Sequence, residues 1–286
     1  MRSLRIIAAL LCAAWLLAGC STLRLAYSQA DHLTYWWLDG HVDFDGEQTR
    51  LTRDGITQWF AWHRASQLPD YAALLERAAV DAAADTTPER ACAWFAALRE
   101  RADTAVQRAL PAAAAVALTL RPEQLELLAR KHAEVAAEAR KAYLQPDPVE
   151  RRDAALDRAI VNAERLYGAL TPAQRTLLAT TVAASPFDAE RWLAERQRRQ
   201  RDLQQVLRGL AAATPPQAET ALLGVWQRVL QAPDAGYERY AQTLERYNCE
   251  AAARLHNTTT PPQREAAQRR LRGWQSDLRL LASAAP

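Results

Sequence analysis

Apolar positions recur at helical spacing along most of the chain. Val149, Leu156, Ile160, Ala163 and Tyr167 are separated by three, four or seven positions, which places them on one face of a helix. Charged residues fill other positions of the same stretch, and no alternating strand pattern of comparable length occurs. The pattern therefore predicts helices whose apolar faces are covered by neighbouring helices.

Five motifs mark helix starts, each with a side-chain acceptor at the N-cap and Glu or Gln three positions later. They are Asp45-Gly-Glu-Gln48, Asp147-Pro148-Val-Glu150, Thr171-Pro172-Ala-Gln174, Thr214-Pro215-Pro-Gln217 and Thr260-Pro261-Pro-Gln263. In all but the first, proline takes the first helical position, where its missing N–H is not needed. Thr87-Pro88 and Ser185-Pro186 are looser versions of this motif.

The expected helices follow from these starts and from the apolar periodicity. They cover residues 22–38, 46–66, 70–84, 88–110, 122–144, 148–170, 172–184, 186–210, 216–230, 237–256 and 261–282. Ala, Leu, Arg, Gln and Glu dominate, as is typical of helices. We predict an all-α fold, an irregular multi-helix bundle of about ten helices. A solenoid is disfavoured because the segments share only their start signal.

The N-terminal stretch has the order of a secretory signal that ends in a lipidation site. Arg2 and Arg5 precede an apolar run from Ile6 to Leu17, and Leu17-Ala18-Gly19-Cys20 follows. This order resembles bacterial lipoprotein precursors, in which the cysteine thiol receives a diacylglycerol before cleavage. The alternative is an uncleaved transmembrane helix, but the run is shorter than the roughly 20 residues that a bilayer requires. We expect residues 1–19 to be the signal peptide and Cys20 the acylated residue.

The mature chain, residues 20–286, is expected to form one helical domain anchored through Cys20. Ser21 follows Cys20 where an aspartate, by resemblance to enterobacterial lipoproteins, would retain the protein in the inner membrane. We therefore expect the periplasmic face of the outer membrane. The whole chain has 36 basic and 33 acidic residues, and removal of Arg2 and Arg5 leaves a net charge near +1. This balance does not indicate a nucleic-acid partner.

Two cysteines, Cys92 and Cys249, remain in the mature chain besides Cys20. In an oxidising periplasm a single leftover pair favours a disulfide. Two separately buried thiols are the alternative. A zinc site is less favoured than either, because the sequence places no further ligands nearby.

Two groups of motifs resemble known families. Leu170-Thr-Pro-Ala-Gln174 and Leu120-Arg-Pro-Glu-Gln124 resemble the Leu-Thr-x-x-Gln motif of the Spy and CpxP periplasmic chaperones and stress sensors, although helix capping produces the same letters. A second set resembles a family of uncharacterised proteobacterial lipoproteins, which implies anchoring and a helical fold but no catalytic residue. Its members here are Leu25-Ala-Tyr27, Trp36-Trp37-Leu38-Asp39, Trp62-His63-Arg64, Leu68-Pro69-Asp70-Tyr71, His256-Asn257-Thr-Thr259 and Gln263-Arg264.

Catalytic, metal and cofactor signatures are missing from the sequence. The histidines are dispersed, without the i, i+4 pairing of a helical metal site. Residues 39–46 have the acidic spacing of part of a calcium loop, but His41 and Thr52 stand where carboxylates are needed. No nucleophile elbow or phosphate-binding glycine loop occurs. We expect no enzymatic activity, no cofactor and no metal.

Two clusters are candidate binding sites. Trp36, Trp37, Trp59 and Trp62 lie in the first part of the mature chain and are suited to stack on sugars, although the spacing of the last two favours core packing. Arg196, Arg198, Arg199 and Arg201 lie in a run without apolar residues, which predicts an exposed helical surface. This run is either a solvated helix segment that extends past the core or a cationic patch for anionic lipid, lipopolysaccharide or an acidic protein.

These observations favour a non-enzymatic binding or scaffolding role in the cell envelope. The membrane is the expected partner through acylated Cys20. The alternatives are a Spy/CpxP-like chaperone or stress sensor, based on the Gln motifs, and an enzyme acting on peptidoglycan, based only on the aromatic cluster.

Overall fold

The computed structural model describes residues 22–284, and every regular element in this range is helical. The predicted all-α fold is therefore confirmed. In chain order the elements are α2 (Thr22–Ser28), α3 (Ala30–Val42), α4 (Gly46–Trp62), the π-helix η1 (His63–Gln67), α5 (Leu68–Asp81), α6 (Pro88–Ala117), α7 (Pro122–Tyr143), α8 (Pro148–Tyr167), α9 (Pro172–Ala183), α10 (Ala189–Arg208), α11 (Pro215–Leu230), α12 (Ala235–Asn257) and α13 (Pro261–Ser283).

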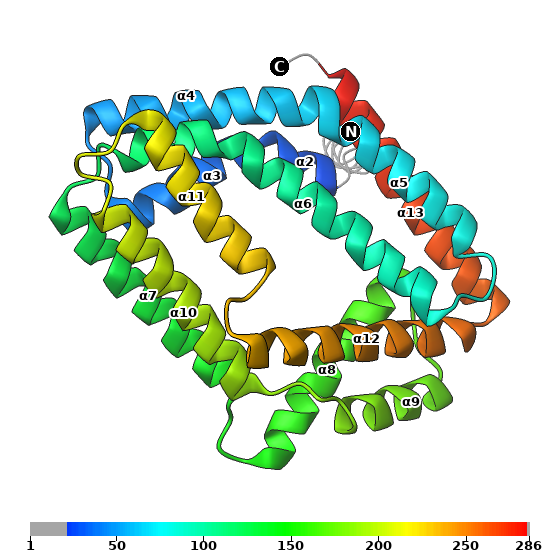
Figure 1. Cartoon of the computed structure of the whole chain (residues 1–286). Coiled ribbons are helices and arrows are strands. Elements are labelled where there is room, and N and C mark those ends of the chain that lie inside the picture. The colour runs from blue at the N-terminus through cyan, green and yellow to red at the C-terminus, as the bar shows by residue number, and fades with distance from the viewer. Residues whose placement is uncertain (1–21, 285–286) are drawn as a thin grey trace, which may run out of the picture.

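The helices are arranged around the sides of an open frame (Figure 1). Helix α4 forms one side, the paired helices α5 and α13 form the next, and α12 and the pair α7 and α10 form the other two. The long helix α6 contacts α4, α11 and α12 and so connects the sides. Helix α3 packs against α4 and α7 at the corner where the chain first turns.

The five predicted helix starts are all present, with Asp45, Asp147, Thr171, Thr214 and Thr260 at N-cap positions. Thr87 also caps its helix, by accepting a hydrogen bond from Arg90 N. The expectation for Ser185-Pro186 was wrong. Helix α10 starts at Ala189, where the carboxylate of Asp188 accepts from Arg191 N at 3.1 Å. The negative charge of this carboxylate is also favourable at a helix N-terminus, whereas Ser185 Oγ accepts from Phe187 N in the preceding loop.

Two prolines lie inside helical segments where the sequence predicted helix ends. Helix α6 continues through Pro111 to Ala117 because its last turns pack their alanines against α11. Between α4 and α5 the chain stays helical through Pro69, with η1 as a corner. Leu68 N donates to His63 O across this wider turn, so the helix changes direction just before the proline, which has no N–H to donate.

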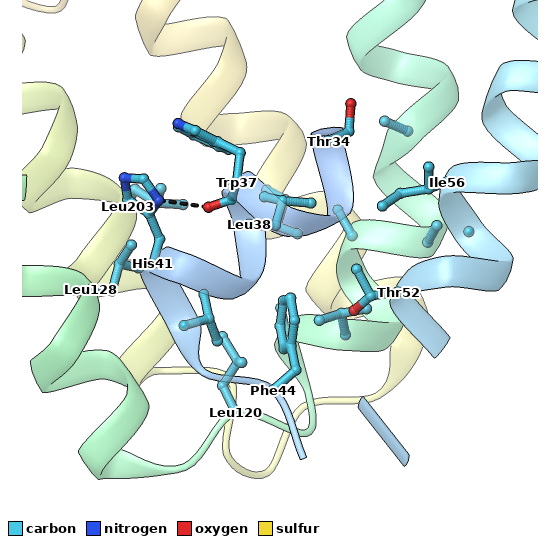
Figure 2. A pocket seen from close by; sticks show the side chains of 18 of the residues that line it. Thr34, Trp37, Leu38, His41, Phe44, Thr52, Ile56, Leu120, Leu128 and Leu203 are labelled. Carbon is cyan, nitrogen blue, oxygen red and sulfur yellow. Dashed lines mark hydrogen bonds between the residues drawn. The ribbon is translucent and has the colours of Figure 1, made fainter. Parts of the chain in front are cut away.

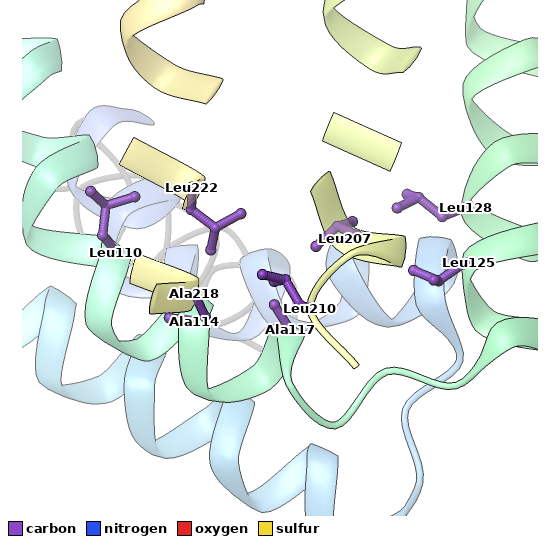
Figure 3. Packing of buried hydrophobic residues seen from close by; sticks show 9 residues of the cluster. All are labelled: Leu110, Ala114, Ala117, Leu125, Leu128, Leu207, Leu210, Ala218 and Leu222. Atoms are coloured by element: carbon purple, nitrogen blue, oxygen red, sulfur yellow. The ribbon is translucent and has the colours of Figure 1, made fainter. Parts of the chain in front are cut away.

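The buried apolar side chains form several small clusters instead of one continuous core. The largest joins α6, α7, α10 and α11 (Figure 3), and its members are Leu110, Ala114, Ala117, Leu125, Leu128, Leu207, Leu210, Ala218 and Leu222. Two others lie between α5 and α13, and one lies between α8 and α9. Alanine is frequent in these clusters, so the helices approach closely while each contact buries little area.

The N-termini of α4 and α7 are joined by a reciprocal pair of glutamine side chains. Gln48 Nε2 donates to Gln124 Oε1 at 3.0 Å, and Gln124 Nε2 donates to Gln48 Oε1 at 2.6 Å. The second N–H of each amide donates to a loop carbonyl, Thr119 O or Asp43 O. Each Oε1 also accepts from the backbone N–H of its own N-cap residue. Both amides are thus fully hydrogen-bonded in a buried position.

The same arrangement joins α9 to α13 through Gln174 and Gln263. Their amides exchange hydrogen bonds of 2.8 and 2.9 Å, and the remaining donors reach Thr258 O and Ala169 O. We call each of these pairs a glutamine clasp, Gln48 with Gln124 and Gln174 with Gln263. The two glutamines of each clasp are 76 and 89 positions apart in the chain, respectively. The clasps therefore stabilise tertiary structure as well as helix ends.

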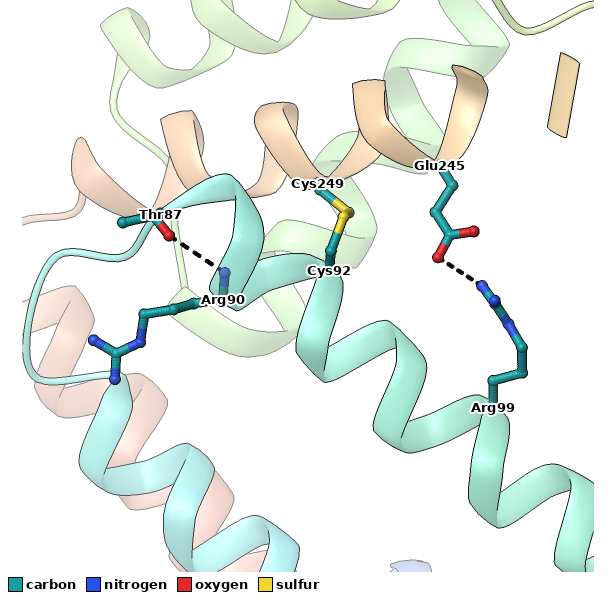
Figure 4. The surroundings of a disulfide bond; sticks show 6 residues. All are labelled: Thr87, Arg90, Cys92, Arg99, Glu245 and Cys249. Atoms are coloured by element: carbon teal, nitrogen blue, oxygen red, sulfur yellow. Dashed lines mark hydrogen bonds and ion pairs between the residues drawn. A yellow bond between two sulfur atoms is a disulfide. The ribbon is translucent and has the colours of Figure 1, made fainter. Parts of the chain in front are cut away.

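The sulfur atoms of Cys92 and Cys249 are bonded in a disulfide, the pairing favoured by the sequence (Figure 4). Their Cα atoms lie 5.2 Å apart, within the range of natural disulfides. The bond connects the first turns of α6 to the middle of α12. Nearby, Arg99 on α6 forms an ion pair of 2.7 Å with Glu245 on α12.

Candidate functional site

A cavity of about 780 Å³ lies between α3, α4, α6, α7, α10 and α11. Its volume falls within the range of small-molecule sites, about 300–1,000 Å³. Figure 2 shows Leu38, Phe44, Ile56 and Leu120 around it, with His41, Leu128 and Leu203 together at the opposite end from Ile56 and Thr52. Most of the lining side chains are aliphatic or aromatic. The cavity is therefore suited to an apolar group.

The wall of the cavity between α4 and α6 depends on small residues. Gly55 and Ala112 both line it, and a Cβ atom on Gly55 would lie only 2.8 Å from the Cβ atom of Ala112. Real Cβ atoms do not approach this closely. The two helices therefore touch at Gly55 because this residue has no side chain.

The titratable side chains that line the cavity are all basic. Arg108, Arg196, His41 and His132 contribute to it, and no Asp or Glu is found among the described residues that line it. Among the ion pairs of residues 22–284, none includes Arg108 or Arg196. An unbalanced positive charge beside an apolar cavity favours an anionic group there.

The two histidines have defined hydrogen-bond partners. The Gln204 amide nitrogen lies 3.1 Å from His132 Nδ1 and can only donate, so the neutral His132 ring carries its proton on Nε2. His41 Nδ1 lies 2.7 Å from Trp37 O and donates to it. Burial, with added repulsion from His41 and Arg196, lowers the pKa of His132 below its ordinary value. His132 therefore presents a neutral N–H donor at neutral pH.

Two polar atoms in the cavity lining are buried without a hydrogen-bond partner within residues 22–284. They are Thr52 Oγ1 on α4 and Arg196 Nε on α10. Thr52 is only 5% exposed. A buried polar atom left unpaired costs about 1–3 kcal/mol, so these atoms mark positions where a bound molecule would be stabilised.

The four tryptophans singled out in the sequence do not form one contact cluster. Trp59 and Trp62 are half-buried with ring centroids 5.9 Å apart, and Trp59 also stacks on His63 and donates to Ala105 O. This is core packing, as their spacing favoured. Trp36 and Trp37 are instead 74% and 57% exposed on α3. Only Trp37 and Trp59 reach the cavity lining.

The prediction that all four arginines of α10 lie on an exposed surface was wrong. Only Arg201 is exposed. Arg198 and Arg199 bond the carboxylate of Glu195, a residue that is only 5% exposed, at 2.7 and 2.8 Å. Burial alone would raise the pKa of Glu195, but the hydrogen bonds and charges of these two arginines outweigh it and lower the pKa. Arg196 lines the cavity. The polar run is covered because α10 packs against both α7 and α11.

The glutamines of the chaperone-like motifs are used inside the fold. Gln124 and Gln174 are 3% and 2% exposed, and all their amide hydrogen-bonding groups are occupied by the glutamine clasps. In this chain the motif letters therefore have a structural role in capping and joining helices. Sequence reasoning missed the clasps, although Gln instead of Glu at four of these helix starts was a signal, since only an amide also donates.

The described residues were also compared with the requirements of a metal site and of a membrane-spanning helix. Within residues 22–284, no group of three or more His, Cys, Asp and Glu side chains is placed to hold a metal ion. No helix in the same range has the length and apolar character needed to span a bilayer. Cys20, the expected lipidation site, and the signal segment lie outside the described residues.

The cavity was not predicted from the sequence, because its lining comes from six helices distributed over much of the chain.

Neither a curated protein nor a solved structure matches the chain. Residues 40–235 match the model of a family of unknown function, DUF6279, and this region includes most of the cavity lining. The chain belongs to this DUF6279 family.

Proposed function

We propose that this protein is a lipid-anchored lipoprotein of the bacterial cell envelope that binds a small amphiphilic or apolar molecule without catalysing a reaction. The cavity between α3 and α10 is the observation on which the binding role rests. It has the volume of a ligand site, an apolar lining and two unpaired polar atoms. The anchored location rests on the sequence order Leu17-Ala18-Gly19-Cys20.

The outer face of α2 and α3 supports a position next to a membrane. Its exposed side chains include Leu25, Leu33, Trp36 and Trp37, whereas the charged residues of both helices are only partly exposed. Tryptophan is enriched at membrane–water interfaces. Helix α2 begins at Thr22, two positions after the expected lipidation site. The uncharged face would therefore adjoin the acyl chains, in the outer membrane as the Ser21 position implies.

Binding to the cavity is tested with the fluorescent probe N-phenyl-1-naphthylamine and the purified mature chain. We expect saturable binding that is weakened in Val116→Trp, because this substitution fills the cavity from α6. Val80→Trp is the matched control, since Val80 lies exposed on α5 outside the cavity. Equal binding by the wild type, Val116→Trp and Val80→Trp would contradict the proposal.

The anchor is tested by replacing Cys20 with Ser and separating the membranes of the producing cells. The wild type should sediment with the outer membrane, because two or more acyl chains give stable attachment. The Cys20→Ser protein, once its signal is cleaved, should move to the soluble periplasmic fraction. Retention of this cleaved variant in the membrane would contradict lipid anchoring through Cys20.

A chaperone-like holdase is the second proposal, favoured by the exposed apolar side chains on α2 and α3. It predicts that the mature chain suppresses aggregation of an unfolded client at a stoichiometric ratio. Replacement of Trp36 and Trp37 by Ser should then reduce the suppression. Unchanged client aggregation in the presence of the wild-type protein would remove this proposal.

A further inference from the structure

The basic end of the cavity has the composition of an anion site. Arg196 and Gln200 reach it from α10, His132 from α7 and His41 from α3. The side chains belong to three helices, so the site depends on the tertiary fold and not on one helix terminus. Figure 2 shows His41 at this end beside Leu128 and Leu203.

Arg196 has no carboxylate partner within residues 22–284, and among the four arginines of its run only the exposed Arg201 shares this feature. Arg198 and Arg199 are bound to Glu195, and Arg228 is bound to Asp202. The Nε atom of Arg196 is buried and without a hydrogen-bond acceptor within the described chain. The residue as a whole is half-buried, and its Cζ atom lies 5.7 Å from the centre of the Trp192 ring. The buried Nε–H therefore still lacks the acceptor that a buried donor normally has.

The rest of the cavity is apolar and extends away from this end. Leu38, Phe44 and Ile56 line it toward α4, and Thr52 contributes the other unpaired polar atom. A molecule that satisfied both parts would have an anionic head near Arg196 and a hydrocarbon chain along the apolar lining. Such a molecule would offset the missing carboxylate and remove apolar surface from water.

We propose that the cavity binds a single-chain anionic amphiphile, with its carboxylate or phosphate at Arg196 and His132 and its acyl chain between α3, α4 and α6. This inference rests on the proposed binding role of the cavity and names the ligand class. The His132 Nε2–H and the Arg196 guanidinium donate to the headgroup. The carboxylate and the phosphate amphiphile have the same plan, with one anionic group attached to one acyl chain.

The test compares three oleoyl compounds below their micelle concentrations, binding to the full mature chain with Cys20→Ser. Oleate carries a carboxylate, oleoyl lysophosphatidate a phosphate, and monoolein no charge. We expect one or both anions to bind at least about tenfold more tightly than monoolein, since a hydrogen bond to a charged group contributes about that factor or more. The tighter of the two identifies the headgroup.

Arg196→Gln should remove this preference and leave the affinity for monoolein unchanged. Arg201→Gln is the matched control, because Arg201 lies exposed on the same helix outside the cavity and should keep the preference. His132→Phe, on α7, is a second variant that should weaken anion binding if Arg196→Gln does not fold.

Two outcomes separate this inference from the proposed function. If monoolein and the naphthylamine probe bind, but the anions show no preference or Arg196→Gln leaves the preference intact, the anion site is refuted and the apolar cavity remains. If none of the oleoyl compounds and no probe binds, the binding role of the cavity fails together with the inference.

Discussion

At the scale of single residues, the position of an amide decides how far a capping motif acts. Gln217 closes a capping box at the start of α11 and is exposed, with its oxygen bonded to Thr214. Gln174 closes the same motif at the start of α9, but it is buried and bonded to Gln263. The two residues have the same local role in a capping box, and they differ in burial and in tertiary partner.

Gln174→Ala should therefore destabilise the protein by roughly 2–4 kcal/mol, because it removes a helix cap and leaves one N–H of the buried Gln263 amide and the Thr258 carbonyl without their Gln174 partner. Gln217→Ala, the control, should cost at most about 1 kcal/mol, the value of an ordinary cap. Urea unfolding of both variants measures the difference. Equal destabilisation would show that the Gln174–Gln263 contact adds nothing beyond capping.

The capping residues were predictable because the rule is local, with an acceptor and an amide three positions apart on one chain segment. The clasps were not, because Gln48 and Gln124 are 76 positions apart and nothing in either segment specifies the other. The cavity could not be predicted for the same reason, because its lining residues are far apart in the sequence. Its basic end needs α3, α7 and α10 together, and the sequence placed Arg196 with its neighbours in a solvated run.

At the scale of elements, helix α10 shows that a segment predicted to be exposed from its polarity can be covered by neighbouring helices. Its run from Glu195 to Asp202 contains no apolar residue, yet Glu195 is buried and Asp202 pairs with Arg228 of α11. The arginines neutralise these carboxylates on the faces that α7 and α11 cover. A charged helix can therefore pack internally when its own i, i+3 and i, i+4 partners balance the charge.

Replacing Arg198 and Arg199 together by Gln should lower stability by about 2–4 kcal/mol, because Glu195 would remain as a buried, uncompensated carboxylate. Arg201→Gln should change stability by less than about 0.5 kcal/mol. Thermal or urea unfolding gives both values. Addition of Glu195→Met to the double variant should restore part of the loss, and failure to do so would assign the loss to packing of the arginine stems.

At the scale of the whole molecule, separate small clusters hold the frame together, and the disulfide joins the connecting helix α6 to the side formed by α12. The bond between Cys92 and Cys249 closes a loop of 157 positions. In the chain-entropy model, a loop of that length corresponds to about 5 kcal/mol of stabilisation, an upper value. This is comparable with the net stability of many domains, about 5–15 kcal/mol.

Peptide mapping of protein from the periplasm, without reduction, should recover Cys92 and Cys249 in one linked species. Cys92→Ala with Cys249→Ala should unfold at lower urea concentration than the wild type, by up to about 5 kcal/mol. Two freely alkylatable thiols in the native protein would contradict the crosslink. They would also remove a main reason to treat residues 20–286 as one domain.

The contact between Gly55 and Ala112 also has a consequence for how this family can diversify. A single added carbon at Gly55 would collide with α6, so this position sets the distance between two walls of the cavity. Changing Gly55 to Ala would push α4 and α6 apart, whereas shortening Ala112 to Gly would let them close or leave a void. One-carbon changes at these two positions would thus change the width of the cavity between α4 and α6. They would select the acyl chains that fit, without altering the residues that we propose bind the headgroup.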